Sequence, residues 1–216
     1  GHVRDLGADY SKARGYMTKD ELAFHSDRCD IASLCCLHPA KSGGTHRIAS
    51  SAMIYNAMLK RRPDLARELI ALFYCSRHGE IPLGETEPWS RVPIFDFHEG
   101  YFTARGAGTP IFKAQELPGV PQLTAAQHEA LQYYRDMAIE FHIDVEFEAG
   151  DIGFVMNHVT IHSRTEYDEW SDEERKRHLL RLWLNNGSRP LCEANRKENA
   201  GVILQDTVLQ TPLEAA

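Results

Sequence analysis

An imidazole and a carboxylate stand two residues apart in the segment Phe-His-Ser-Asp that ends at Asp27. In an extended strand, residues i and i+2 point to the same face, so His25 and Asp27 can reach one metal ion together. One more histidine completes a set of two histidines and one carboxylate, which suits non-heme Fe(II) with open positions for O2 and a co-substrate. Because such a triplet also arises by chance at exposed strand ends, the assignment depends on the rest of the chain.

A second stretch, Asn-His-Val-Thr-Ile-His-Ser-Arg, ends at Arg164 and offers the third ligand. His162 lies in a β-rich segment directly after an apolar strand, and His158 is a rival on spacing alone. Arg164 follows His162 by two residues and should share its face. A role for Arg164 in the site and a salt bridge with Glu166 or Asp168 both remain open.

The segment 177–184, Arg-His-Leu-Leu-Arg-Leu-Trp-Leu, carries two arginines on one face of a predicted strand. Alternation places Arg177, Leu179, Arg181 and Trp183 on that face. Arginines are costly to bury on an apolar strand without anions, and the planar guanidinium group suits carboxylates. The strand is therefore suited to hold two acidic groups, a co-substrate and a substrate.

The composition is that of a globular protein, with 216 residues, 43% hydrophobic and 25% charged, which fits one domain with a sizeable core. The formal net charge of −7 gives no overall attraction to nucleic acid or anionic membranes. No apolar run approaches the roughly 20 residues of a membrane span. We expect a cytoplasmic protein with reduced cysteines, a small-molecule substrate, and no nucleic-acid or membrane partner. Homo-oligomer formation is left open.

Short strands are predicted around the candidate site, and helices outside it. Apolar or alternating runs indicate strands at 22–27, 31–37, 45–49, 145–148, 152–156, 159–163 and 177–184. A helix is predicted from Ser50 or Ser51 to Lys60, a second from Pro63 through Leu72, and a third from Thr124, where Gln127 completes a capping box.

Two loop-rich stretches, 81–93 and 106–121, flank a hairpin predicted from strands at 92–97 and 101–105. Long connections in a β scaffold often cover a site. Trp89 in the first stretch is therefore a candidate for the wall of the substrate pocket. Aromatic residues near hairpins also serve as packing, which is the alternative role for Trp89.

Four sequence blocks occur in one order: Phe-His-Ser-Asp, Ala-Lys-Ser-Gly-Gly, Gly-Asp-Ile-Gly-Phe-Val-Met-Asn followed by Ile-His-Ser-Arg, and Arg-His-Leu-Leu-Arg-Leu-Trp-Leu. In this order, over residues 22–190, the chain resembles the TauD/TfdA family of Fe(II)- and 2-oxoglutarate-dependent dioxygenases. The resemblance implies a mainly β fold with flanking helices, a double-stranded β-helix (jelly roll) of the clavaminate synthase-like type. We expect residues 1–216 to form a single domain that lacks part of the family's longer N-terminal region.

The resemblance also implies roles for individual residues. Iron would be held by His25, Asp27 and His162, which are then the catalytic residues. An arginine in the position of Arg177 pairs with the distal carboxylate of 2-oxoglutarate in the family. Arg181 matches a position that meets the anionic group of the substrate in taurine-type members, and with Arg164 and Trp89 it forms the expected substrate-binding set.

One departure from the family concerns the residues after the Gly-Gly pair. Members commonly carry Ser or Thr two residues after it, near 2-oxoglutarate, whereas here Thr45 comes one residue early and His46 occupies that place. Either residue could serve. The implied reaction uses Fe(II), 2-oxoglutarate and O2, releases succinate and CO2, and hydroxylates a small polar metabolite that is anionic or amino-acid-like.

Other outcomes of the same site remain open. Asp27 argues against halogenation, because halogenating relatives lack the carboxylate and bind halide in its place. Desaturation and cyclisation are alternatives to hydroxylation. A non-catalytic jelly-roll protein that binds a small molecule is the alternative from a different functional class.

Overall fold

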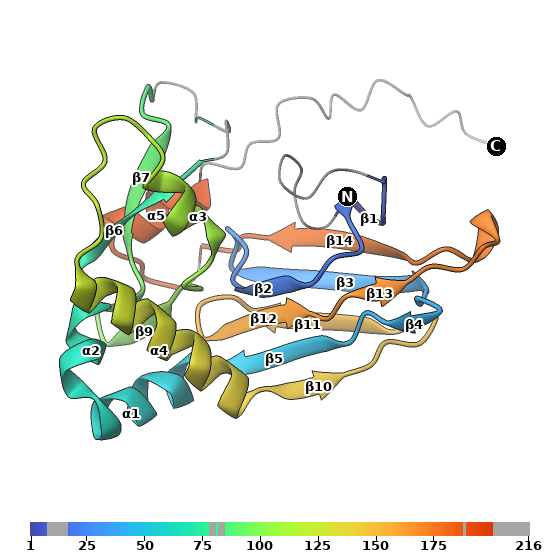
Figure 1. The fold of residues 1–216 in the computed structure, drawn as a ribbon, viewed down its shortest axis with the longest axis horizontal. Helices are drawn as coiled ribbons and strands as arrows, with labels where there is room; N and C mark the ends of the chain where they lie inside the picture. The colour runs from blue at the N-terminus through green and yellow to red at the C-terminus, as the bar shows by residue number, and fades with distance from the viewer. Residues whose placement is uncertain (8–16, 78–80, 82–84, 188, 201–216) are drawn as a thin grey trace.

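The computed structural model of the chain describes residues 1–7, 17–77, 81, 85–187 and 189–200 (Figure 1). Two four-stranded antiparallel sheets lie at its centre, with strand orders β1-β14-β3-β11 and β10-β5-β12-β2. Each sheet joins strands from the first 50 residues to strands that follow residue 142. Residues far apart in the sequence are thereby brought into one layer.

Six strands of these sheets correspond closely to predicted ones, whereas β1 was not predicted and the strand predicted at 145–148 lies at 143–145. The first sheet consists of β1 (His2–Val3), β3 (Ile31–His38), β11 (Ile152–Met156) and β14 (His178–Leu184). The second consists of β2 (Leu22–His25), β5 (His46–Ser50), β10 (Ile143–Val145) and β12 (Thr160–Arg164). A short pair is formed by β4 (Ser42–Gly43) and β13 (Tyr167–Asp168). Because β2 ends at His25, Asp27 lies just after the strand and not within it as predicted.

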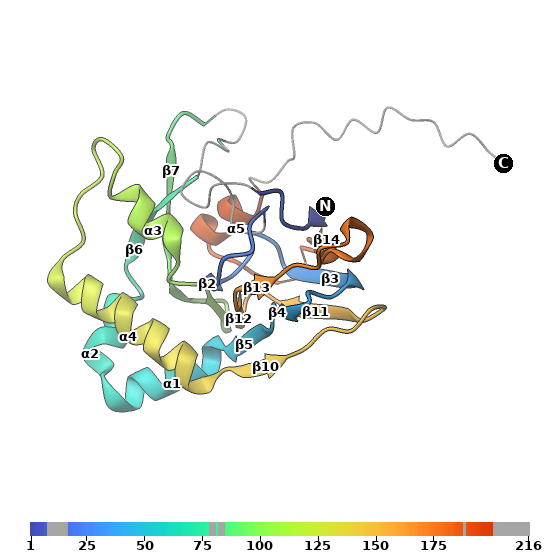
Figure 2. The same ribbon diagram turned by 45° about the vertical axis from the view of Figure 1, so that its right-hand side comes forward.

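The helices and two further strand pairs gather at one side of the two sheets (Figures 1 and 2). The helices are α1 (Ser51–Arg61), α2 (Pro63–Glu68), α3 (Thr109–Ala114), α4 (Ala125–Phe141) and α5 (Glu193–Ala200), with a 3-10 turn at Glu173–Arg175. The strand pairs are β6 (Leu72–Ser76) with β7 (Trp89–Pro93), and β8 (Phe95–His98) with β9 (Tyr101–Ala104).

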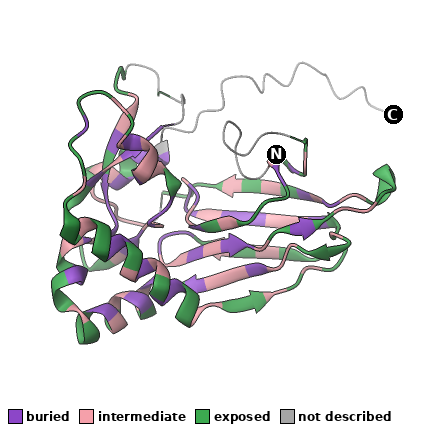
Figure 3. Ribbon diagram, viewed as in Figure 1, coloured by how far each residue is buried: buried purple, intermediate pink, exposed green. Residues whose placement is uncertain are grey.

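Local signals set the helix starts, and one apolar face of each helix faces the core. At the start of α1, the hydroxyl of Ser50 accepts a hydrogen bond from the N–H of Met53. At the start of α4, Thr124 forms the predicted capping box with Gln127. Buried side chains of both helices join the same core cluster (Figure 3). This cluster includes Ile54, Met58, Leu131, Tyr134 and Ala138. The helices are therefore scaffold for the sheets.

Predictions for the helix that begins at Pro63 and for the two loop-rich stretches were wrong. The second helix ends at Glu68, and Leu72 already begins β6, which was not predicted. The stretch 81–93 was predicted as a loop but contains β7, which pairs with β6, and the stretch 106–121 contains α3. Pairing between β6 and β7 is not local in the sequence, so the pattern of either segment alone does not reveal it. The hairpin of β8 and β9 was predicted correctly.

Both faces of the first sheet are apolar. On β14, Leu180 and Leu182 point outward and are exposed, whereas Leu179, Arg181 and Trp183 point inward. The predicted alternation is therefore confirmed from Leu179 to Leu184, whereas Arg177 lies before the strand and the register shifts between His178 and Leu179. The inward face is the one that carries the charged side chain.

Within the described residues, no helix is both long and apolar enough to cross a membrane. The expected location in the cytoplasm and the expected lack of nucleic-acid partners remain predictions. The assignment of the whole chain to one domain, and its state of association, also remain predictions.

Candidate metal centre

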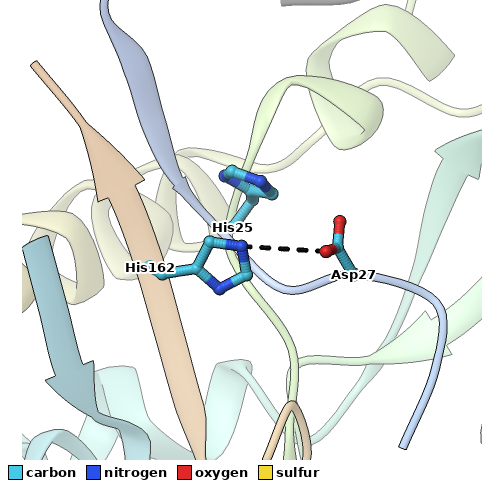
Figure 4. Close-up of side chains that lie close together, drawn as sticks. All are labelled: His25, Asp27 and His162. Atoms are coloured by element: carbon cyan, nitrogen blue, oxygen red, sulfur yellow. Dashed lines mark ion pairs between the residues drawn. The ribbon is translucent and has the colours of Figure 1, made fainter. Parts of the chain in front are cut away.

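Three side chains, from the end of β2, the residues just after it and β12, lie close together (Figure 4). His25 ends β2, Asp27 follows it by two residues, and His162 lies in the middle of β12, directly across the ladder from His25. One ligand atom of each lies within 4.8 Å of the others, and no further group of this kind occurs in the part of the chain that the structure describes. This is the set of donors that suits Fe(II).

The two imidazoles are oriented for ligation. Nδ1 of His25 lies 2.8 Å from the carbonyl oxygen of Ala23, to which it donates, so Nε2 keeps its lone pair for a metal. Nε2 of His162 lies 3.9 Å from Oδ2 of Asp27 (Figure 4). Burial, followed by the charge of His25, lowers the pKa of His162 to about 4. His162 is therefore neutral at ordinary pH, as a metal ligand must be.

The carboxylate of Asp27 stays ionised although it is buried. Burial works against its charge, but the two neighbouring histidines, the Arg181 guanidinium and the Trp183 N–H together hold the pKa of Asp27 below its ordinary value. Nε1 of Trp183 donates to Oδ2 over 2.9 Å. Nη1 of Arg181 lies 3.9 Å from Oδ1. The cluster thus offers two imidazole nitrogens and one carboxylate anion as donors.

A close backbone contact fixes the end of β2. A Cβ on Gly106 would lie 2.5 Å from the Cα of His25, so only glycine allows the loop after β9 to pack against this strand end. The N–H of Gly106 donates to the hydroxyl of Ser26 over 3.2 Å. Ser26, between the two predicted ligands, therefore anchors the loop after β9 at this strand end.

Arg177 lies just before β14 and is buried, with 3% of its surface exposed. Its Nη2 donates to Nε2 of His46 over 3.2 Å, and its guanidinium lies 4.9 Å from the centre of the Tyr167 ring. Nη1 of Arg177 is buried and has no hydrogen-bond partner among the described residues. No carboxylate of the described residues lies within ion-pair distance of this guanidinium. A buried cation with an open donor is suited to an anion from outside the chain.

Of the two candidates near the Gly-Gly pair, His46 is the one at Arg177. Burial, followed by the charge of Arg177, lowers the pKa of His46 to about 3, so its imidazole is neutral. Its ring packs on Phe147 with 4.9 Å between centroids. Thr45 points elsewhere, because its Oγ1 donates to Glu146 over 2.5 Å and its N–H donates to Thr165.

Two cavities adjoin at this place. One of about 140 Å³ lies between the two four-stranded sheets and is lined by the metal-ligand candidates together with Arg164, Arg177 and Arg181. The other, of about 190 Å³, is lined by residues of the Lys-Ser-Gly-Gly turn. His46, Phe147 and Arg177 line both. Of the three residues predicted to bind the co-substrate, Arg177 and His46 therefore line the cavity that the metal-ligand candidates also line, and Thr45 does not.

The remaining predicted residues differ in their placement. Arg164 lines the first cavity, but its NH2 group donates to the backbone carbonyls of Thr18 and Asp20, so that it ties the preceding segment to β12. Trp89 lies on β7, packs on Tyr74, and lines neither cavity.

The rival ligand lies apart from the metal centre. His158 contacts Asp30 over 3.0 Å between Nε2 and Oδ1, and it does not belong to the cluster. Burial, only partly offset by Asp30, lowers the pKa of His158. Spacing alone could not separate His158 from His162, whereas the pairing of β12 with β2 does.

Three contributors were not assigned a role from the sequence. Trp183 was placed on the correct face of its strand, but its bond to Asp27 depends on how the two sheets meet. Asn157, whose Oδ1 accepts the N–H of Asp27 over 3.2 Å, belongs to a conspicuous block, Val-Met-Asn-His. Nothing in the sequence near Tyr167 indicates that its ring covers Arg177.

Comparison with known proteins agrees with this geometry. Residues 1–183 match the family described as taurine catabolism dioxygenase TauD, TfdA family. FR-33289 synthase of Streptomyces rubellomurinus is 37% identical over 196 residues, 85% of this chain and 56% of that protein. Taurine hydroxylase-like protein SAT17 of Stachybotrys chartarum is 33% identical over 167 residues, 74% of this chain and 41% of that protein. The chain thus spans about half the length of these relatives.

Solved structures show the same fold. An asparagine oxygenase in complex with Fe(II), 3-hydroxyasparagine and succinate matches with a TM-score of 0.64 at 18% identity, covering 85% of this chain and 56% of that one. PvcB, an Fe, alpha-ketoglutarate dependent oxygenase, matches with a TM-score of 0.58 at 16% identity, covering 85% and 62%. The predicted jelly-roll fold, mainly β with flanking helices, is thereby confirmed. From the family match and these identities, the chain belongs to the TauD/TfdA family of dioxygenases.

Proposed function

We propose that this chain carries the active site of an Fe(II)- and 2-oxoglutarate-dependent oxygenase. The observation that supports this most directly is the cluster of His25, Asp27 and His162, whose ligand atoms lie within 4.8 Å of one another. These residues would hold Fe(II), because two neutral imidazoles and one carboxylate leave coordination positions open. Bound Fe(II) supplies the oxidation of 2-oxoglutarate by O2 to succinate and CO2, coupled to hydroxylation of the substrate.

Arg177 binds the distal carboxylate of 2-oxoglutarate in this proposal. The support is its burial, its open Nη1 donor and the absence of a carboxylate partner in the described residues. His46 orients the guanidinium by accepting from Nη2, in the place where the family commonly has Ser or Thr. Because its pKa is lowered to about 3, the imidazole of His46 is neutral and does not neutralise the positive charge of Arg177, which stays available to 2-oxoglutarate.

The substrate is a small molecule with an anionic group that Arg181 meets. The guanidinium of Arg181 lines the cavity beside Asp27 and keeps 22% of its side-chain surface exposed. A cation at that depth orients an anion close to the metal centre. Apolar side chains such as Ile48, Val145 and Phe147 form about half of the cavity lining and limit the water around these charged groups.

Succinate release by the protein, incubated with Fe(II), 2-oxoglutarate, O2 and a panel of small anionic metabolites, tests this function. We expect release that depends on Fe(II) and one substrate, and its loss in Asp27→Ala. The control Asp136→Ala removes an exposed carboxylate on α4 and should keep full turnover. Full turnover by Asp27→Ala would show that the metal assignment is wrong.

The same assay separates the alternatives. A non-catalytic binding protein would bind a small molecule without forming succinate, with or without Fe(II). Desaturation and cyclisation would release succinate and yield a product two mass units lighter than the substrate, whereas hydroxylation adds one oxygen atom. Mass spectrometry of the product therefore decides between them.

A further inference from the structure

The carboxylate of Asp27, which follows β2 of the second sheet, is contacted by side chains of β14 in the first sheet. Nε1 of Trp183 donates to its Oδ2 over 2.9 Å, and Nη1 of Arg181 lies 3.9 Å from its Oδ1. Trp183 and Arg181 are two residues apart on β14 and share the inward face of that strand. Apart from His162, whose Nε2 lies 3.9 Å from Oδ2, the side chains that contact the two oxygens of Asp27 therefore come from one strand.

Asp27 needs such support because its own backbone lies outside the ladder. The strand β2 ends at His25, and the described hydrogen bond of the Asp27 backbone N–H goes to the side chain of Asn157, over 3.2 Å. This bond fixes the main chain but leaves the rotation of the carboxylate free. A directed donor to one carboxylate oxygen removes that freedom, as groups behind metal ligands commonly do.

Trp183 is suited to orientation and not to chemistry. An indole N–H is a donor only, does not titrate and does not bind metal through nitrogen. The same ring also lies against the guanidinium of Arg181, with 4.6 Å between Cζ and the ring centroid. One half-buried side chain therefore contacts both the metal-binding carboxylate and the cation expected to meet the substrate.

We propose that Trp183 is a positioning residue that sets the orientation of the Asp27 carboxylate toward the metal and its placement relative to Arg181. This inference rests on the proposed function for the identity of the metal and of the substrate anion. It assigns to Trp183 a role in metal affinity that acts through Asp27. Removal of the indole N–H should therefore lower the metal affinity only in a protein that still carries the Asp27 carboxylate.

Calorimetric titration of the metal-free protein with Co(II), as a redox-stable substitute for Fe(II), tests this. We expect Trp183→Phe, which keeps an aromatic ring, to weaken Co(II) binding about 10-fold. In the Asp27→Ala background the same substitution should change the affinity less than 2-fold by the same reasoning. Trp170→Phe, which removes an indole that packs on Arg175, serves as the control with unchanged affinity. An unchanged affinity in Trp183→Phe, or an equal loss in both backgrounds, would overturn the proposal.

A measurement on the protein with all three tryptophans covers the case in which Trp183→Phe does not fold. In a 15N–1H correlation spectrum, the indole signal of Trp183 should shift when Zn(II) is added and should differ in Asp27→Ala, whereas the Trp170 signal stays in place. A Trp183 signal that shifts neither on addition of Zn(II) nor in Asp27→Ala would contradict the proposal. The succinate assay is separate: a wild-type protein that binds metal but releases no succinate refutes the proposed function, not the role of Trp183.

Discussion

Arg177 and His46, 131 residues apart in the sequence, meet through a contact of 3.2 Å between Nη2 and Nε2. Because a guanidinium group only donates, the imidazole accepts and carries its proton on Nδ1. The cation is thus held by an uncharged partner. Its charge and its open Nη1 donor are left for an anionic co-substrate.

The first prediction concerns this cation. Arg177→Leu should raise the dissociation constant for 2-oxoglutarate about 100-fold, because it removes charge-assisted hydrogen bonds in a buried site. Anaerobic titration of the Fe(II)-loaded protein, followed by its visible charge-transfer absorption, measures this constant. Arg175→Leu, which removes a cation on the nearby 3-10 turn, is the control and should bind 2-oxoglutarate normally. Wild-type affinity in Arg177→Leu would contradict the assignment.

The second prediction concerns pH and His46. Burial and the charge of Arg177 lower the pKa of His46 from 6.5 to about 3. Below pH 6.5 the unfolded chain takes up a proton at this residue that the folded protein does not bind. The free energy of unfolding should therefore fall as pH falls toward 3, by at most about 1.4 kcal/mol per pH unit from this one group.

Urea unfolding of the metal-free protein at pH 7.5, 6.0 and 5.0 checks this sign. His46→Gln lacks the titrating group, so it should lose less stability than the wild type between these pH values. Other histidines contribute equally to both proteins and cancel in the difference. Equal losses in the two proteins would contradict a depressed pKa at His46.

The third prediction compares two glycines of one loop. Gly106→Ala should destabilise the protein by about 2 kcal/mol and weaken Co(II) binding, because its Cβ would lie 2.5 Å from the Cα of His25. Gly108→Ala is the matched control, since its Cβ would make only an ordinary contact of 3.6 Å with the carbonyl oxygen of Phe24. Thermal unfolding and calorimetric titration measure the two effects. Similar behaviour of both variants would show that the close approach does not matter.

The fourth prediction concerns Asp30, which binds the backbone that follows β14. Its carboxylate accepts from the N–H groups of Asn186 and Gly187 and from Nε2 of His158. Burial works against its charge, but these bonds keep the pKa of Asp30 below its ordinary value. Asp30→Ala leaves the buried imidazole of His158 and two part-buried backbone N–H groups without this acceptor and should cost about 3 kcal/mol of unfolding free energy. Urea unfolding measures it, and a loss no larger than that of the exposed Asp136→Ala would count against this role.

The sequence by itself determined which donors are present and how they are spaced. The periodicity of an extended chain, which is a local property, predicted that His25 and Asp27 share a face and that Arg177 and Arg181 do. In the structure Asp27 and Arg177 lie just outside their strands. Local signals likewise placed the helix starts at Ser50 and Thr124, because capping depends on residues within one turn.

Only the tertiary structure decided how these donors are completed. The pairing of β12 with β2 sets His162 opposite His25, while Asp30 engages His158. The meeting of β5 with the start of β14 brings His46, and not Thr45, to the buried guanidinium of Arg177. The approach of β14 to the end of β2 gives Asp27 its bond from Trp183. Each of these contacts joins strands distant in the sequence, so it depends on sheet register, which no local pattern encodes.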